Sequence, residues 1–273
     1  MLRTRSPWIL CAAAVSISAQ PSGLAGWLRA IEAADRSILA PDTRPPDGMA
    51  AELQIRIPAL NDSARIVAAG VLRKVDSPES GSLLLQLVRD PGQGVAAAAS
   101  RALRDSRNLP PGEDILRVIP ALPVAVIRSH LFLAAGRART SLTALRLVLD
   151  KEPDFLARNA GRAAAIRLGG VSERAALALA VRQSRAEDLV RLLDLSVYTQ
   201  DRRMGSALLP LFGSREPIMQ ISSDADSLMA TRADLAVWTA HELGLIPQLR
   251  LTRLRRFDAA TIAAARAACA KAK

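Results

Sequence analysis

The sequence is poor in the residues from which catalytic and metal sites are most often built. It has two histidines and two cysteines among 273 residues, too few for a cluster of His and Cys ligands around a metal ion. Only 3% of the residues are aromatic, which leaves little for stacking against nucleic-acid bases. No glycine run has the spacing of a phosphate-binding loop. We therefore expect a protein that is not an enzyme and that holds neither a metal ion nor a cofactor.

Strand-forming patterns are missing as well. Val, Ile, Tyr and Phe do not recur with the period of two that marks a half-buried strand. Half of the residues are hydrophobic, and alanine and leucine supply most of that fraction. Small and straight side chains of this kind suit closely packed helices. The composition predicts an all-α fold.

The chain carries a net charge of +11, from 37 basic and 26 acidic residues. Such an excess attracts anionic partners, for example nucleic acid, a phospholipid surface or an acidic protein. The basic residues are dispersed along the chain, however, and dispersion is typical of solvated helix faces. Only the stretch after Leu249 has a dense local excess of positive charge.

Residues 1–20 resemble a secretory signal peptide. Arg3 and Arg5 form a short positive region, and Trp8–Ala19 is an apolar stretch too short to span a bilayer comfortably. We expect cleavage near its end and export to the periplasm or the medium. Retention by an uncleaved N-terminal anchor is the alternative. Residues 21–48 are expected to form a short helix and a proline-rich linker.

Residues 49–273 carry a repeated helical pattern. Its clearest copy, Leu84–Asp105, comprises an apolar helix, a turn with Asp90 and Pro91, and an alanine-rich second helix. In the second helix the apolar residues form one stripe at i, i+3, i+4, i+7 and i+8. Stripes of this kind begin, in steps of 31, 32 and 33 residues, at Ala64, Val95, Ile127 and Ala160. Because two helices cannot bury both of their stripes alone, successive pairs must stack.

The period breaks after Ser172. The remaining pattern predicts a helix at Ser172–Gln183, a helix opened by a capping box at Ser184–Glu187, a polar loop at Gly213–Ser223, one long helix at Ser227–Leu245, and a last helix pair at Leu249–Phe257 and Asp258–Ala272.

Leu84–Asp105, with its second-helix motif V-x-x-A-A-x-x-A-L, resembles a HEAT repeat of the short bacterial kind seen in phycobilin-lyase-like proteins. Weaker copies lie at Leu53–Lys74 and Leu142–Gly169. The resemblance implies an α-solenoid (superhelix) of stacked antiparallel helix pairs, about seven HEAT-like units. It also implies a concave face that binds other macromolecules.

HEAT repeats tend to carry a ladder of turn aspartates and helix arginines. In the clearest unit Asp90 stands at the turn position, but Ala96 replaces the arginine. Arg65 and Arg128 fit the arginine position in two other units, where no aspartate stands at the matching turn. The resemblance therefore implies an incomplete ladder.

Arginines are the candidate partner-binding residues. Those in second helices would present a row of positive charge to a partner: Arg65, Arg128, Arg158 and Arg162. The C-terminal stretch adds Arg253, Arg255 and Arg256. We favour a terminal cap with a polar outer face for this stretch. A basic amphipathic helix that makes a weak contact with an anionic membrane surface is the alternative.

The histidines and the second cysteine do not form a chemical site. His241 and Glu242 begin a zinc-protease pattern, but Leu245 replaces the second histidine. His130 falls on an apolar stripe, where we expect a buried histidine hydrogen-bonded to a neighbouring group. Cys269 is expected to pack in an alanine-rich helix.

These patterns predict a non-enzymatic helical-repeat scaffold that mediates protein–protein interaction in the bacterial cell envelope. Two alternatives stay open: a HEAT-like nucleic-acid-binding protein, and an accessory array for a lyase or prolyl-isomerase type enzyme. Scarce aromatics and the predicted export make nucleic acid the weaker choice.

Overall fold

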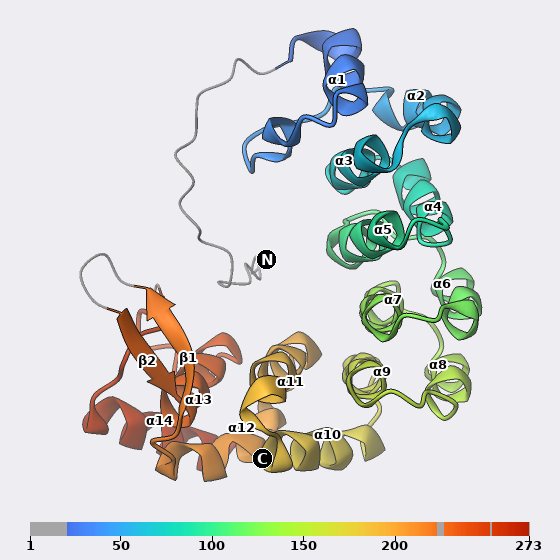
Figure 1. Cartoon of the computed structure of the whole chain (residues 1–273). Helices are drawn as coiled ribbons and strands as arrows, with labels where there is room; N and C mark the ends of the chain where they lie inside the picture. Colours follow the sequence, from blue (N-terminus) through green and yellow to red (C-terminus); the bar gives the residue numbers. More distant parts are fainter. Residues whose placement is uncertain (1–20, 223–226, 252, 273) are drawn as a thin grey trace. The chain divides into compact units, whose positions relative to one another are not determined.

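The computed structural model describes residues 21–222, 227–251 and 253–272. These residues form two compact bodies, an N-terminal body of residues 21–168 and a C-terminal body of residues 169–272. Fourteen α-helices lie in the described part of the chain, and neighbouring helices pack against one another (Figure 1). Within these ranges no helix is both long enough and apolar enough to cross a membrane. The predicted signal peptide lies outside the described residues.

The N-terminal body begins with short elements that cover its first helix pair. Helix α1 (Gly23–Glu32) and the 3-10 turn η1 (Arg36–Leu39) both contact helix α3 (Asp62–Leu72). Trp27 of α1 is buried here. Residues 40–48 contain no helix, in agreement with the predicted proline-rich linker.

Four helix pairs follow in the N-terminal body. They are α2 (Met49–Arg56) with α3, α4 (Pro78–Leu87) with α5 (Gln93–Asp105), α6 (Gly112–Val118) with α7 (Ala125–Arg137), and α8 (Leu142–Leu149) with α9 (Phe155–Arg167). The second helices α3, α5, α7 and α9 contact one another in that order. First helices contact as well, α2 with α4 and α6 with α8, and the two sets form two rows in Figure 1.

The predicted apolar stripes are largely buried, and the last step of the repeat is shorter than the sequence indicated. The N-caps of the second helices are spaced by 31, 32 and 30 residues, at Asn61, Gly92, Val124 and Asp154. The fourth stripe therefore begins at Ala157 instead of the predicted Ala160. Asp154 sets this start, because its Oδ1 accepts a hydrogen bond from Ala157 N at 2.8 Å.

The C-terminal body contains five α-helices and one hairpin. Its main elements are α10 (Ser172–Gln183), α11 (Ala186–Thr199), α12 (Gly205–Leu208) continued by the 3-10 turn η5 (Leu209–Gly213), strands β1 (Pro217–Ser222) and β2 (Ser227–Thr231), α13 (Arg232–Glu242) and α14 (Ala259–Lys271). Helix α10 contacts α12 and α11 contacts α13, so first helices again meet first helices and second helices meet second. Helix α14 packs against α12, η5 and α13.

The hairpin corrects the all-α prediction: the fold is predominantly α-helical with one small sheet. Strands β1 and β2 are antiparallel, with Met219 opposite Ala230 and Ile221 opposite Leu228. Helix α13 begins only at Arg232, not at Ser227 as predicted. The reason is a capping box in which Thr231 Oγ1 accepts from Asp234 N (3.3 Å) and Asp234 Oδ2 accepts from Thr231 N (2.8 Å).

Two further helix predictions in this body are wrong. The described residues of Leu249–Phe257 are not helical, and Asp234 holds the end of this stretch, since Asp234 Oδ1 accepts a hydrogen bond from Phe257 N at 2.9 Å. Arg253, Arg255 and Arg256 therefore do not lie on an amphipathic helix. Ser184 does not cap α11 either.

The true N-cap of α11 is Arg185, which offers no side-chain cap. Ser184 Oγ instead donates to Val181 O at 2.8 Å, so it closes the preceding helix. The Ser-x-x-Glu motif alone therefore does not identify the N-cap of α11.

Replacing Leu84 with alanine tests the stacked core. Leu84 in α4 is 0% exposed, so Leu84→Ala removes buried carbon atoms and leaves a cavity. We expect a loss of about 2–5 kcal/mol in the free energy of unfolding, measured by urea denaturation. Leu147→Ala in α8 is the matched control, since Leu147 is 63% exposed. Equal losses in the two variants would contradict the assigned core.

Candidate functional site

Arginines at one repeated position join successive helix pairs. Arg65, four residues after the N-cap of α3, has Nη1 3.0 Å from Oδ2 of Asp90, which lies in the turn before α5. At the same position of α7, Arg128 forms a bidentate ion pair with Glu152, which precedes α9. Its Nε and Nη2 each donate to one carboxylate oxygen at 2.8 Å. The carboxylate side chains are only 6% and 2% exposed. Charge-assisted hydrogen bonds thus connect one pair to the next.

The junction between these two is apolar on both sides. Ala96 in α5 and Leu122 before α7 occupy the arginine and acid positions. A lone arginine or a lone acid would leave a charge buried without a partner, whereas Ala96 and Leu122 leave none. The predicted gap in the ladder is therefore real, but each arginine does meet an acid. The acid partners of Arg65 and Arg128 were not found from the sequence, because each acid belongs to the following helix pair.

The remaining arginines of the predicted row also contact their own body. Arg158 Nε and Nη2 donate to the carbonyl oxygens of Glu152 and Pro153 at 2.8 and 3.0 Å. Arg162 Nη1 donates to Asn159 Oδ1 at 3.1 Å. Of the four arginines Arg158 is the exposed one. Their contact with a partner stays a prediction, while their structural contacts are established.

His130 is buried and hydrogen-bonded, as expected from its place on a stripe. Its Nδ1 lies 3.0 Å from Ser100 Oγ, and that hydroxyl is 2.9 Å from Ala97 O. Burial lowers the pKa of His130 to about 4, assisted by the positive charge of nearby arginines. A serine beside a histidine is a familiar catalytic pair. Here Ser100 is 0% exposed, so no substrate reaches it.

Other titratable groups give no chemical site in the described ranges. No group of three or more His, Cys, Asp or Glu residues there is arranged to hold a metal ion. His241 contacts the ring of Trp238, with centroids 5.9 Å apart. Cys269 is buried, and burial raises the pKa of its thiol to about 11, so the reactive thiolate is disfavoured.

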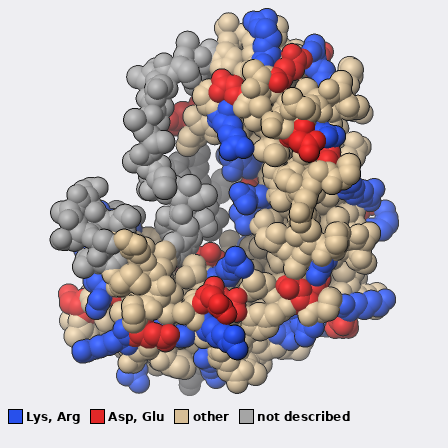
Figure 2. Space-filling view, in the orientation of Figure 1, with Lys and Arg blue, Asp and Glu red and all other residues tan. Residues whose placement is uncertain are grey.

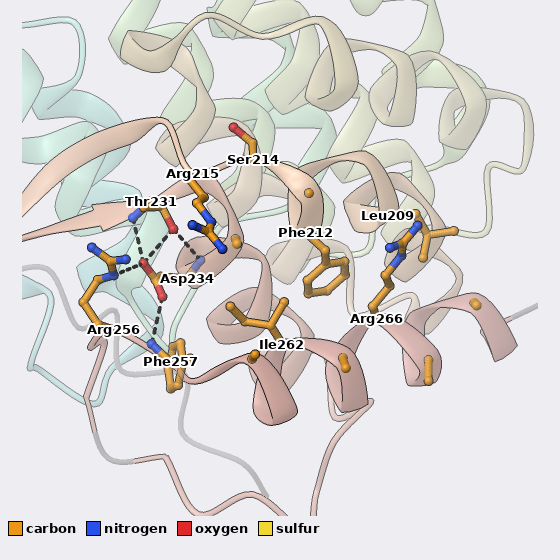
Figure 3. Close-up of a pocket in the computed structure, with 16 residues that line it drawn as sticks. Leu209, Phe212, Ser214, Arg215, Thr231, Asp234, Arg256, Phe257, Ile262 and Arg266 are labelled. Carbon is orange, nitrogen blue, oxygen red and sulfur yellow. Dashed lines mark hydrogen bonds and ion pairs between the residues drawn. The ribbon is translucent and has the colours of Figure 1, made fainter.

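A pocket of about 780 Å³ opens in the C-terminal body next to the base of the hairpin (Figure 3). Its lining comes from η5 and the two residues after it (Ser214 and Arg215), from Thr231 and the start of α13, from Arg256–Phe257, and from one face of α14. The hairpin lies between Arg215 and α13 in the chain, and its last residue, Thr231, both lines the pocket and caps α13. One lining residue therefore comes from the element that the sequence did not predict.

Asp234 organises one end of the pocket. The side chain is 1% exposed and takes hydrogen bonds from Thr231 N, Thr231 Oγ1 (2.7 Å) and Phe257 N. Arg256 Nε lies 3.1 Å from its Oδ2. A buried carboxylate with this many donors is compensated, and it acts as a structural hub.

Positive and apolar side chains surround the rest of the pocket. Arg215 and Arg266, both exposed, line it together with Arg256. In the view of Figure 3, Phe212 and Ile262 lie between Arg256 and Arg266. An anion with an apolar body matches this lining.

The sequence-based candidates are only partly found at this pocket. Arg256 is among the lining residues, whereas Arg253 and Arg255 are not. Arg255 instead lies over the ring of Phe257, 5.7 Å from its centroid. Arg215 and Arg266 were missed, because a loop and a helix far apart in the sequence supply them. The Thr-x-x-Asp motif at Thr231, which marks the capping box of α13, was the sequence signal that pointed to this end of the pocket.

Surface charge is mixed on the face shown in Figure 2, where acidic side chains are interspersed among the basic ones over the described helices. On this face the pattern agrees with the dispersed basic residues of the sequence and offers no broad track for a polyanion.

No family model, curated protein or solved structure matches this chain. The fold and the site therefore define it as a predominantly helical protein of packed neighbouring helices.

The bridge between Arg128 and Glu152 is tested by copying the apolar junction. Arg128→Ala leaves Glu152 buried and unpaired, so we expect a loss of about 3–5 kcal/mol in the free energy of unfolding. The double variant Arg128→Ala/Glu152→Leu reproduces Ala96 and Leu122 and should recover most of that loss. Urea denaturation measures both. A double variant less stable than Arg128→Ala would show that the ion pair itself is required.

His130 predicts a specific loss of stability in acid. Its pKa is about 4 in the folded protein against about 6.5 in an unfolded chain. The contribution of neutral His130 is therefore complete above pH 6.5 and disappears as the pH falls towards 4. We expect it to account for about 3 kcal/mol. His130→Gln should lose less stability between pH 7.5 and 4.5 than the wild type. An identical pH profile would refute the assignment.

Proposed function

We propose that the protein is a HEAT-type α-solenoid that acts as a non-enzymatic scaffold and binds a protein partner in the bacterial cell envelope. The observation that carries the proposal is the ordered contact of α3, α5, α7 and α9, with Arg–carboxylate bridges at two of the three junctions. Each pair uses only the faces towards its neighbours for stacking. The remaining faces form a continuous surface, and surfaces of this kind bind macromolecules.

One part of this surface offers exposed apolar side chains. Val126 and Phe155 stand at the starts of the adjacent helices α7 and α9 and are 49% and 47% exposed. Pro123 and Pro153, in the turns just before them, are exposed as well. We call these four residues the turn patch. Exposed apolar groups next to an aromatic ring are common centres of protein–protein contact.

The turn patch is confined to the third and fourth helix pairs. At the corresponding start of α5 the chain has Gln93 and Gly94, which offer no apolar surface. The repeat does not need bulky apolar residues at these positions, since α5 stacks without them. We therefore assign the turn patch to the binding of a partner.

Photo-crosslinking tests the proposal. A photoreactive phenylalanine analogue at position 155 of the full chain should give a defined crosslinked protein in an envelope extract. Val126→Ser in the same chain should reduce its yield about tenfold, as expected when a central apolar contact is lost. The analogue at position 147 is the control, because Leu147 is exposed on α8 outside the turn patch.

Equal products at positions 155 and 147, or none at 155, would contradict the scaffold proposal. Fractionation of the producing cells checks its second half. A processed chain in the envelope is expected, and an unprocessed cytoplasmic chain would refute export.

A further inference from the structure

The pocket in the C-terminal body is distinct from the surface proposed to bind a protein. We propose that it is a binding site for a small amphiphilic anion, a carboxylate or phosphate head on a short apolar chain. Charge, shape and preformed contacts of the lining all favour such a ligand, whether or not the N-terminal body binds a protein.

The lining of the pocket has more positive than negative side chains. Its lining contains three arginines and one acid, Asp234, in the part of the chain that the structure describes. Asp234 is fully occupied by Thr231, Phe257 and Arg256. Arg215 and Arg266 have no acidic partner among the described residues. In Figure 3 Arg215 lies at the Asp234 end of the pocket and Arg266 at the other end. At either end a guanidinium group therefore remains to receive an anionic head through charge-assisted hydrogen bonds.

The apolar part of the lining matches a short hydrocarbon chain. Leu209, Phe212 and Ile262 contribute carbon surface between the arginines, and the alanine face of α14 adds small side chains that leave the space open. A volume of about 780 Å³ is in the range of pockets that enclose small ligands, roughly 300–1,000 Å³. Phosphate alone would leave this surface unused, so the ligand needs both parts.

The polar end of the pocket is rigid before any ligand arrives. The buried Asp234 fixes the end of the hairpin, the start of α13 and the Arg256–Phe257 loop through the contacts given above. A preformed site loses little conformational entropy when it binds its ligand.

Titration calorimetry with simple amphiphiles tests the site. Octanoate and octyl phosphate, below their micelle-forming concentrations, should bind the full chain at one saturable site. Octanol and inorganic phosphate, which each lack one half of the ligand, should bind at least about tenfold more weakly. A preference for octyl phosphate identifies a phosphate head, and a preference for octanoate identifies a carboxylate head.

Matched variants locate the site. Ala263→Phe places a ring in the pocket and should abolish binding, while Ala264→Phe, at an exposed neighbour that does not line the pocket, should not. Arg215→Gln/Arg266→Gln should weaken binding about tenfold or more, and Arg253→Gln should leave it unchanged. The two Phe variants should have the same thermal midpoint. Absence of saturable binding by both amphiphiles, or equal binding by the two Phe variants, would overturn the proposal.

Discussion

The N-terminal body depends on the burial of one apolar face of each second helix between two neighbours. A short isolated helix is marginal in water, and tertiary burial supplies most of its stability. Val67, Val95 and Leu131 are each 0% exposed in α3, α5 and α7, although none of these helices covers its own stripe. Each helix pair therefore needs a neighbouring pair to bury its apolar stripe. The Arg–carboxylate bridges add direction to this packing, since they connect a helix only to the turn that follows in the stack.

The apolar stripes explain why so much of this body was predictable. Period and residue size specify a buried helix face locally, so Ala64 and Val95 were found from the sequence alone. The cap of α3 is equally local, since Asn61 Oδ1 accepts a hydrogen bond from Ala64 N at 2.9 Å. The acid partners of Arg65 and Arg128 were not predictable in this way. They lie one repeat further on, and the apolar pair Ala96–Leu122 shows that the repeat does not require them.

The C-terminal body was predicted less well because distant residues override local preference there. Leu249–Phe257 has the composition of an amphipathic helix, yet Phe257 N donates a hydrogen bond to Asp234, a residue far away in the sequence, and not to a helical carbonyl group. The sequence period breaks after Ser172, at the start of α10. Helices α10 and α11 form an ordinary pair, and the departure from the repeat is the hairpin between η5 and α13. The pocket, whose Arg215 and Arg266 have no acidic partner in the described part of the chain, lies next to the end of that hairpin.

The two bodies thus illustrate two uses of the same helix-pair packing. Stacked helix pairs in the first leave apolar side chains exposed at the starts of α7 and α9, while the second has a pocket with three arginines next to the end of its hairpin. The account rests on the claim that neighbouring pairs stabilise one another in series. Native-state hydrogen exchange in low urea tests it most directly. Amides of the central helices α5 and α7 should exchange last and those of α1 first; exchange of α5 and α7 as fast as α1 would contradict it.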